Sequence, residues 1–315
     1  MESEKELKVL EIVMPVLVMI CLGMFCKKKK LLTPKGIEDM KILVTQIMLP
    51  AAIFHALATA EYNRKTGILV GIMFVMLLVS FLAGFVFKPF MYEKYRKYLP
   101  FMVSVYEGGL MAYPLYTSLC GSENLSQIAV LDIAGLLFGF SVYMGMLNQI
   151  ENNDRINVKK LFFNAVRTPA FIASVLGIGA GLTSIVSGLL KSSWGAVYSG
   201  VENILTTSVT AIILLVVGYS IELDKKLLKY CIRTILLRVL IQGIMILAVL
   251  FAVHHLVGNY VELNLAIIIY MSAPATFSMQ TFLKSEDGSA YVSTTNSIYC
   301  LVSIAVYTIM AFVFI

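Results

Sequence analysis

The sequence predicts an all-α integral membrane protein whose ten transmembrane helices form two inverted five-helix repeats. Composition is the first observation: 59% of the 315 residues are hydrophobic and only 14% are charged, whereas soluble domains have about 25% charged residues. Ten long hydrophobic stretches are the second observation. The third is a pair of prolines in matching stretches of the two halves, which predicts that helices 4 and 9 are broken.

Ten windows along the chain are long and apolar enough to cross a bilayer. A spanning helix needs about 20 mostly apolar residues, and the windows of that size are 9–26, 38–60, 67–88, 99–119, 126–147, 161–182, 196–222, 228–255, 262–283 and 289–315. The connections are short, so no soluble domain is expected. The polar segment 148–160 divides the chain, which predicts one repeat over residues 1–150 and a second over 151–315.

Lysine and arginine residues are unevenly distributed between the two sets of loops. Most of the 25 basic residues follow odd-numbered spans, as in residues 27–30, 94–97 and 225–229. Because cytoplasmic loops are enriched in Lys and Arg, we expect both termini to lie on the outer side of the cell membrane. The bias accounts for the net charge of +6 without a nucleic-acid partner, and the run at 27–30 is interpreted as an anchor to membrane lipids.

The two halves of the chain match in the order of their hydrophobic stretches. A shift of about 160 residues places Pro114 on Pro274 and the span 9–26 on 169–186. Since each half has five spans, the second half begins on the opposite side of the membrane, which is typical of secondary transporters. The alternative is that the two prolines are ordinary kinks that match by coincidence.

The prolines lie in two stretches that are unusual for a membrane helix, "EGGLMAYPLY" at 107–116 and "SAPATFSMQ" at 272–280. Proline removes a backbone donor and glycine unwinds easily, and in lipid the freed groups need partners. We therefore expect a cavity where the two breaks meet. The N–H groups near residues 115–117 and 275–277 would begin new half-helices, whose positive dipole ends suit a carboxylate.

The candidate substrate-binding residues are those of the two breaks and the polar side chains beside them: Glu107, Gly108, Gly109, Tyr113, Pro114, Thr117, Pro274, Thr276, Ser278 and Gln280. The sequence near either break holds no Lys or Arg. We therefore expect helix dipoles, and not full charges, to attract the anion.

Several motifs together resemble the auxin efflux carrier/malate permease family. They are "VMPVLVMICLG" and "LPAAIF" in the first two spans, "GGLMAYPL" in the fourth, "LLVVGYSIEL" in the seventh and "SAPATFSMQ" in the ninth. The resemblance implies the ten-helix fold of bile-acid/sodium symporters. It also implies a dimerising scaffold of spans 1, 2, 6 and 7 and an elevator-like transport domain of spans 3–5 and 8–10. The implied substrates are small organic anions such as malate, malonate or indole-3-acetate.

Three positions depart from the pattern of that family. Glu107 and Ser278 stand where the family usually has Asn, and Ala112 stands where it has Gly. The substrate is therefore left open. Ionised, Glu107 would repel an anion, and protonated it would donate to one, so our hypothesis is that it couples proton and substrate movement.

Other polar residues within the spans need a role or a partner, because charges are costly in the membrane. Asp132 is either an ion-coupling residue or a packed, hydrogen-bonded one, and Asn296 is a candidate to share an ion site with it. His55 is interpreted as an interior histidine of the scaffold. Arg238 is expected to reach the cytoplasmic surface or an internal carboxylate.

The leading hypothesis is a secondary transporter of a small organic acid, and not an enzyme, because the sequence shows no spacing of paired acids, metal ligands or nucleophile and base. No cofactor or metal is expected, and the sequence lacks an ATP-binding loop. Coupling to H⁺ or Na⁺ is left open. The alternative is a membrane-embedded sensor that keeps the transporter fold. A homodimer through the scaffold helices is the expected assembly.

Overall fold

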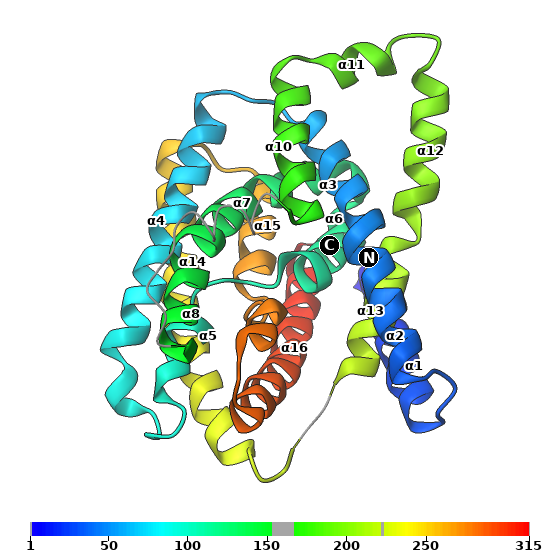
Figure 1. The fold of residues 1–315 in the computed structure, drawn as a ribbon. Coiled ribbons are helices and arrows are strands. Elements are labelled where there is room, and N and C mark those ends of the chain that lie inside the picture. Colours follow the sequence, from blue (N-terminus) through cyan, green and yellow to red (C-terminus); the bar gives the residue numbers. More distant parts are fainter. Residues whose placement is uncertain (1, 153–166, 222–223, 315) are drawn as a thin grey trace.

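The computed structural model describes residues 2–152, 167–221 and 224–314, and all regular elements in these ranges are helical (Figure 1). Six helices are long and apolar enough to cross a membrane: Leu7–Lys28, Pro34–Ala58, Arg64–Val86, Gly195–Ser220, Leu228–Leu256 and Glu286–Phe314. They fall on the first, second, third, seventh, eighth and tenth predicted spans. An all-helical membrane protein is therefore confirmed.

The other four predicted spans are shorter or interrupted. The sixth contains α10 (Pro169–Leu182), and its residues 161–166 lie outside the described residues, as does most of the polar segment 148–160. The fifth is α7 (Leu125–Phe138), a π turn η6 (Gly139–Tyr143) and α8 (Met144–Asn152). The fourth and ninth are interrupted at their centres and form the site described below.

Local sequence explains where the second and third long helices begin. The second comprises α2 (Pro34–Leu43), a π turn η1 (Val44–Met48) and α3 (Leu49–Ala58), and Thr33 caps it by accepting from the Gly36 N–H at 3.0 Å. The third, α4 (Arg64–Val86), begins with a capping box between Asn63 and Thr66. These caps satisfy N–H groups that a helix start leaves without partners.

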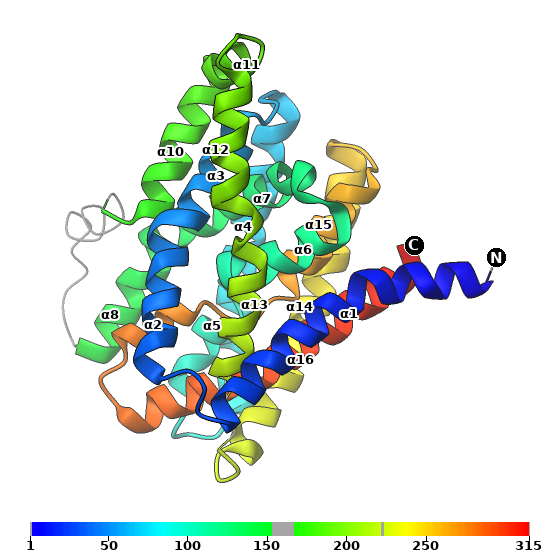
Figure 2. The same cartoon turned by 90° about the vertical axis from the view of Figure 1, so that its right-hand side faces the viewer.

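One group of helices packs through glycine. It consists of α1 (Glu2–Lys28), α3, α10, and the consecutive helices α12 (Gly195–Thr207) and α13 (Val209–Ser220). Figures 1 and 2 show α1 beside α13 and α3 beside α10. A Cβ on Gly23 of α1 would lie 2.2 Å from the Leu215 carbonyl oxygen of α13. A Cβ on Gly181 of α10 would lie 2.7 Å from the Leu57 oxygen of α3. Small residues thus let these backbones touch, as is typical in membranes. We call this group the glycine-packed unit.

A second group of helices packs through large side chains. It contains α4, α7, α14 (Leu228–Leu256), α15 (Val261–Met271) and α16 (Glu286–Phe314). Phe81 of α4 is fully buried and meets Phe85, Phe101 and Phe138 edge to face at centroid distances of 5.1–5.7 Å. Such pairs add to the area that they bury. We call this group the aromatic-packed unit.

Candidate functional site

The first helix break lies at residues 103–107, between α5 (Leu99–Met102) and a π turn η4 (Gly108–Ala112) that continues into α6 (Tyr113–Cys120). The prediction of a new half-helix after Pro114 is wrong. In the π turn, the Ala112 N–H already donates to the Glu107 carbonyl at 3.1 Å, and the Tyr113 N–H donates to the Gly108 carbonyl. Pro114 then lies in the first turn of α6, beyond the start of the helix that begins at Gly108.

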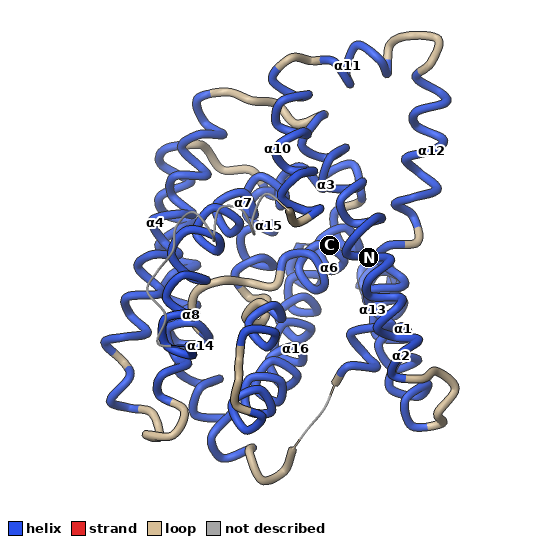
Figure 3. Tube along the Cα trace, in the orientation of Figure 1, coloured by secondary structure: helices blue, strands red, loops and turns tan. Residues whose placement is uncertain are grey.

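The second break lies at residues 272–276, between α15 and a short 3₁₀ helix η7 (Phe277–Phe282). Pro274 lies inside this break, and the Phe277 N–H is at the start of the following helix. Figure 3 shows the stretch before α6 as a loop crossing the interior among the helices.

The two breaks bond to each other. Tyr106 and Ala275 form an antiparallel bridge. The Glu107 N–H donates to the Pro274 carbonyl at 2.8 Å, and the Thr276 N–H donates to the Val105 carbonyl at 3.2 Å. Each break therefore satisfies part of the backbone that the other exposes, as an apolar environment demands. We call residues 103–107 and 272–276 the paired breaks.

The carboxylate of Glu107 caps both helices that leave the paired breaks. Its Oε1 accepts from the Leu110 N–H of η4 at 3.2 Å, and its Oε2 accepts from the Phe277 N–H of η7 at 2.7 Å. The Phe277 N–H is one of the positive ends that the sequence analysis assigned to a bound anion, whereas the other helix start lies at Leu110 and not at residues 115–117. In this structure a side chain of the protein itself holds that position.

A buried arginine caps the two helices that enter the paired breaks. Arg238 of α14 is fully buried and donates to the Met102 carbonyl and, at 2.6 Å, to the Ala273 carbonyl. Its guanidinium carbon also lies 4.6 Å from the centroid of the Tyr299 ring. The expectation that Arg238 reaches the cytoplasmic surface or a carboxylate is therefore wrong. Carbonyl groups freed by the breaks hold it inside the protein, because they are the acceptors within its reach.

Asp132 of α7 lies against the start of η4. Its Oδ2 accepts from the Tyr113 hydroxyl at 2.8 Å, and its Oδ1 accepts from the Tyr270 hydroxyl at 2.6 Å. A Cβ on Gly108 would lie 2.8 Å from Oδ2. The glycine thus gives the carboxylate room beside the first break, so a substituent there would displace Asp132.

A cavity of about 440 Å³ opens beside the paired breaks, and we call it the Glu107 cavity. Glu107, Gly108, Gly109, Asp132, Thr276 and Ser278 line it from the aromatic-packed unit and the breaks, and Glu38, Lys41, Thr45, Gln46 and Thr168 line it from the other side. Lys41 was not among the candidates. The expectation that no cation lies near the breaks is therefore wrong, because the fold brings α2 against them.

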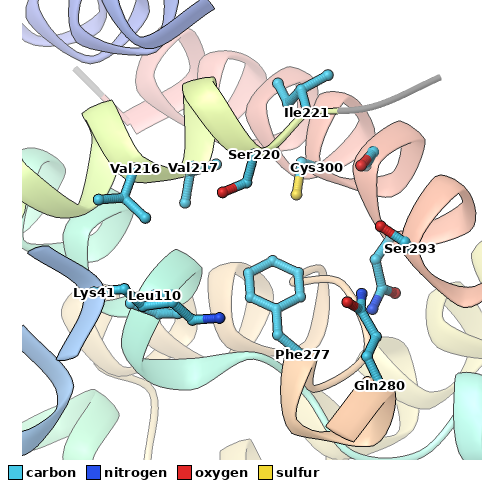
Figure 4. Close-up of a pocket in the computed structure, with 12 residues that line it drawn as sticks. Lys41, Leu110, Val216, Val217, Ser220, Ile221, Phe277, Gln280, Ser293 and Cys300 are labelled. Atoms are coloured by element: carbon cyan, nitrogen blue, oxygen red, sulfur yellow. The ribbon is translucent and has the colours of Figure 1, made fainter. Parts of the chain in front are cut away.

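A smaller cavity of about 120 Å³ shares Lys41, Leu110 and Phe277 with the Glu107 cavity, and we call it the Asn296 cavity. Figure 4 shows Lys41 reaching into it from one wall, with Gln280 and Ser293 on the opposite side. Asn296 is 1% exposed, and its amide donates to the Ala275 carbonyl at 3.1 Å. Its Oδ1 has no hydrogen-bond partner in the described part of the chain.

A third cavity of about 630 Å³, the His55 cavity, holds Tyr113, Pro114 and Thr117. His55 Nδ1 lies 3.0 Å from the Tyr198 hydroxyl, so this histidine has an interior partner. Leu49 lines both this cavity and the Glu107 cavity. A Cβ on Gly109 would lie 2.5 Å from Leu49 Cδ2, so the two residues are in close contact. Leu49 and Gly109 therefore lie between the two cavities.

The predicted site residues are thus divided among three cavities. Pro274 is buried in the second break, and the two ion-coupling candidates are separated, Asp132 in the Glu107 cavity and Asn296 in its own. Sequence reasoning missed Lys41, Arg238 as a cap, and Tyr270. For Lys41 a signal was present, because it lies within the predicted span 38–60 and one turn after Glu38.

Paired helix breaks, several long apolar helices and polar cavities at the breaks are typical of membrane transport proteins. A family model described as "membrane transport protein" matches residues 8–311, nearly the whole chain. The chain therefore belongs to the auxin efflux carrier/membrane transport family. No curated protein matches the chain.

Proposed function

We propose that this protein is a secondary transporter that moves a small organic acid across the cell membrane and binds it at the paired breaks. One observation carries the proposal: the paired breaks border a cavity of about 440 Å³ that contains Lys41. The Lys41 ammonium group has no hydrogen-bond or ion-pair partner among the described residues. A lysine ammonium group without such a partner, in a cavity beside the breaks, suits a carboxylate or dicarboxylate.

The arrangement of the cavity walls supports an elevator mechanism. Residues of η1, α3 and the start of α10 form one wall, and η4, α7 and η7 form the other. Movement of the aromatic-packed unit against the glycine-packed unit would then expose the cavity to alternate sides. This proposal includes two inverted five-helix repeats, a homodimer through the glycine-packed scaffold, outer termini, and coupling to H⁺ or Na⁺.

Uptake by protein in liposomes tests this function. A panel of labelled small carboxylates should enter the liposomes only when the protein is present. We expect Gly108→Ala to reduce uptake by about tenfold, because its Cβ would lie 2.8 Å from Asp132 Oδ2 and displace this carboxylate of the cavity wall, and a loss of about 1.4 kcal/mol in binding is tenfold. The matched control is Gly139→Ala. Gly139 lines the same cavity, but a Cβ there meets no atom within 4 Å.

Each outcome decides between functions. Equal uptake by the two alanine variants would place the substrate elsewhere. If no acid enters the liposomes at any pH, Na⁺ concentration or voltage but one binds tightly, the protein is a sensor that keeps the transporter fold.

A further inference from the structure

The two buried carboxylates of the Glu107 cavity are surrounded by hydrogen-bond donors. Glu107 accepts from two backbone N–H groups and Asp132 accepts from two tyrosine hydroxyls. A protonated carboxyl group needs an acceptor for its own hydrogen. All four contacts instead satisfy carboxylate oxygens, which favours the ionised form. Burial opposes this effect, so the geometry identifies an acidic wall at the breaks, formed by Glu107 and Asp132.

The opposite wall carries the only lysine that lines this cavity in the described ranges. With Glu38 at the same wall, the cavity holds three acidic groups and one basic group. A dicarboxylate would meet one favourable charge and several unfavourable ones. A ligand with one carboxylate and one ammonium group would complement both walls.

A second, independent feature also requires a hydrogen-bond donor. Asn296 lines the cavity that adjoins Lys41 and Phe277, and its Oδ1 is buried without a hydrogen-bond partner among the described residues. An unpaired buried acceptor is unfavourable. Its Nδ2 is already committed to the Ala275 carbonyl at 3.1 Å, which fixes Oδ1 as an acceptor. An ammonium group is a donor that fits both this oxygen and the carboxylate of Glu107.

We propose that the substrate is an amine-bearing organic acid, with its carboxylate at Lys41 and its ammonium group between Glu107 and Asn296, whose cavities adjoin at Lys41, Leu110 and Phe277. This inference rests on the proposed function and narrows its substrate class. It assigns specificity for the amine to Glu107 and Asn296, and it assigns to Lys41 the affinity for the carboxylate that all organic acids share.

Two matched pairs of labelled acids test the inference in the same liposomes. Alanine and lactate differ only in an amine or a hydroxyl group at the second carbon, and so do aspartate and malate. We expect the amino acid of at least one pair to enter at least about tenfold faster than its hydroxy partner. A site whose acceptors pair with an ammonium group disfavours an analogue whose hydroxyl group offers fewer donors. The amino-to-hydroxy ratio does not depend on how much folded protein each preparation contains.

Three variants assign the charges. Glu107→Gln and Asn296→Leu should each bring the ratio toward one, whereas Lys41→Met should lower uptake of both members and leave their ratio unchanged. Equal or faster uptake of both hydroxy acids, or a ratio that neither Glu107→Gln nor Asn296→Leu changes, would overturn the inference and leave the proposed function intact. If no organic acid enters at all, the proposed function fails as well.

Discussion

The two ends of the paired breaks are capped by opposite charges in opposite surroundings. Arg238 caps the carbonyl ends and is fully buried, and it lines none of the three cavities. Glu107 caps the N–H ends, is 9% exposed and lines the largest cavity at the breaks. The comparison teaches that the same backbone interruption provides a closed structural end and an open end where a ligand has access.

Arg238→Met should have the largest effect on stability. It leaves the Met102 and Ala273 carbonyls without a donor inside the protein, at about 1–3 kcal/mol for each, or about 2–6 kcal/mol in total. The melting temperature in detergent measures this loss. Arg233→Met in the same helix is the matched control, because Arg233 is exposed. Similar melting temperatures for the two variants would contradict a structural role for the carbonyl end.

Gln242→Leu should have the next largest effect. Gln242 is 1% exposed, donates to the Val103 carbonyl and accepts from the Tyr106 hydroxyl at 2.6 Å. Leaving the buried Val103 carbonyl without a donor should lower the free energy of unfolding by about 1–3 kcal/mol. A double-mutant cycle supplies the control: Tyr106→Phe should cost less in the Gln242→Leu background, since its hydroxyl has already lost its acceptor. Additive losses would mean that the two side chains act separately.

Glu107→Gln should have the smallest effect on stability, although its effect on substrate choice is large. The amide keeps one acceptor for the two helix starts, and water in the cavity can reach the other N–H. Loss of the charge at a helix N-terminus costs about 0.3–1 kcal/mol. Melting in detergent, with exposed Glu38→Gln on the other cavity wall as control, measures the difference. A loss as large as that of Arg238→Met would remove the distinction between the two ends.

Much of the fold could be predicted from the sequence because it depends on local patterns. Six of the ten apolar windows correspond to helices of spanning length in the described ranges, and the proline in "SAPATFSMQ" marked the second break. The first break was placed too late, because Pro114 is accommodated by a π turn that begins at Gly108. A proline indicates that a helix is perturbed nearby, but the residue where hydrogen bonding fails depends on the neighbouring turns.

The sequence by itself determined that the protein is helical, apolar and interrupted near two prolines. Only the tertiary structure decided which groups satisfy those interruptions: Arg238 reaches back 136 residues to Met102, and Glu107 reaches forward 170 residues to Phe277. Hydropathy and helical period report on each residue and its near neighbours. The partners of a broken backbone come from distant parts of the chain, so the position of Lys41 beside the breaks became visible only when the helices were packed together.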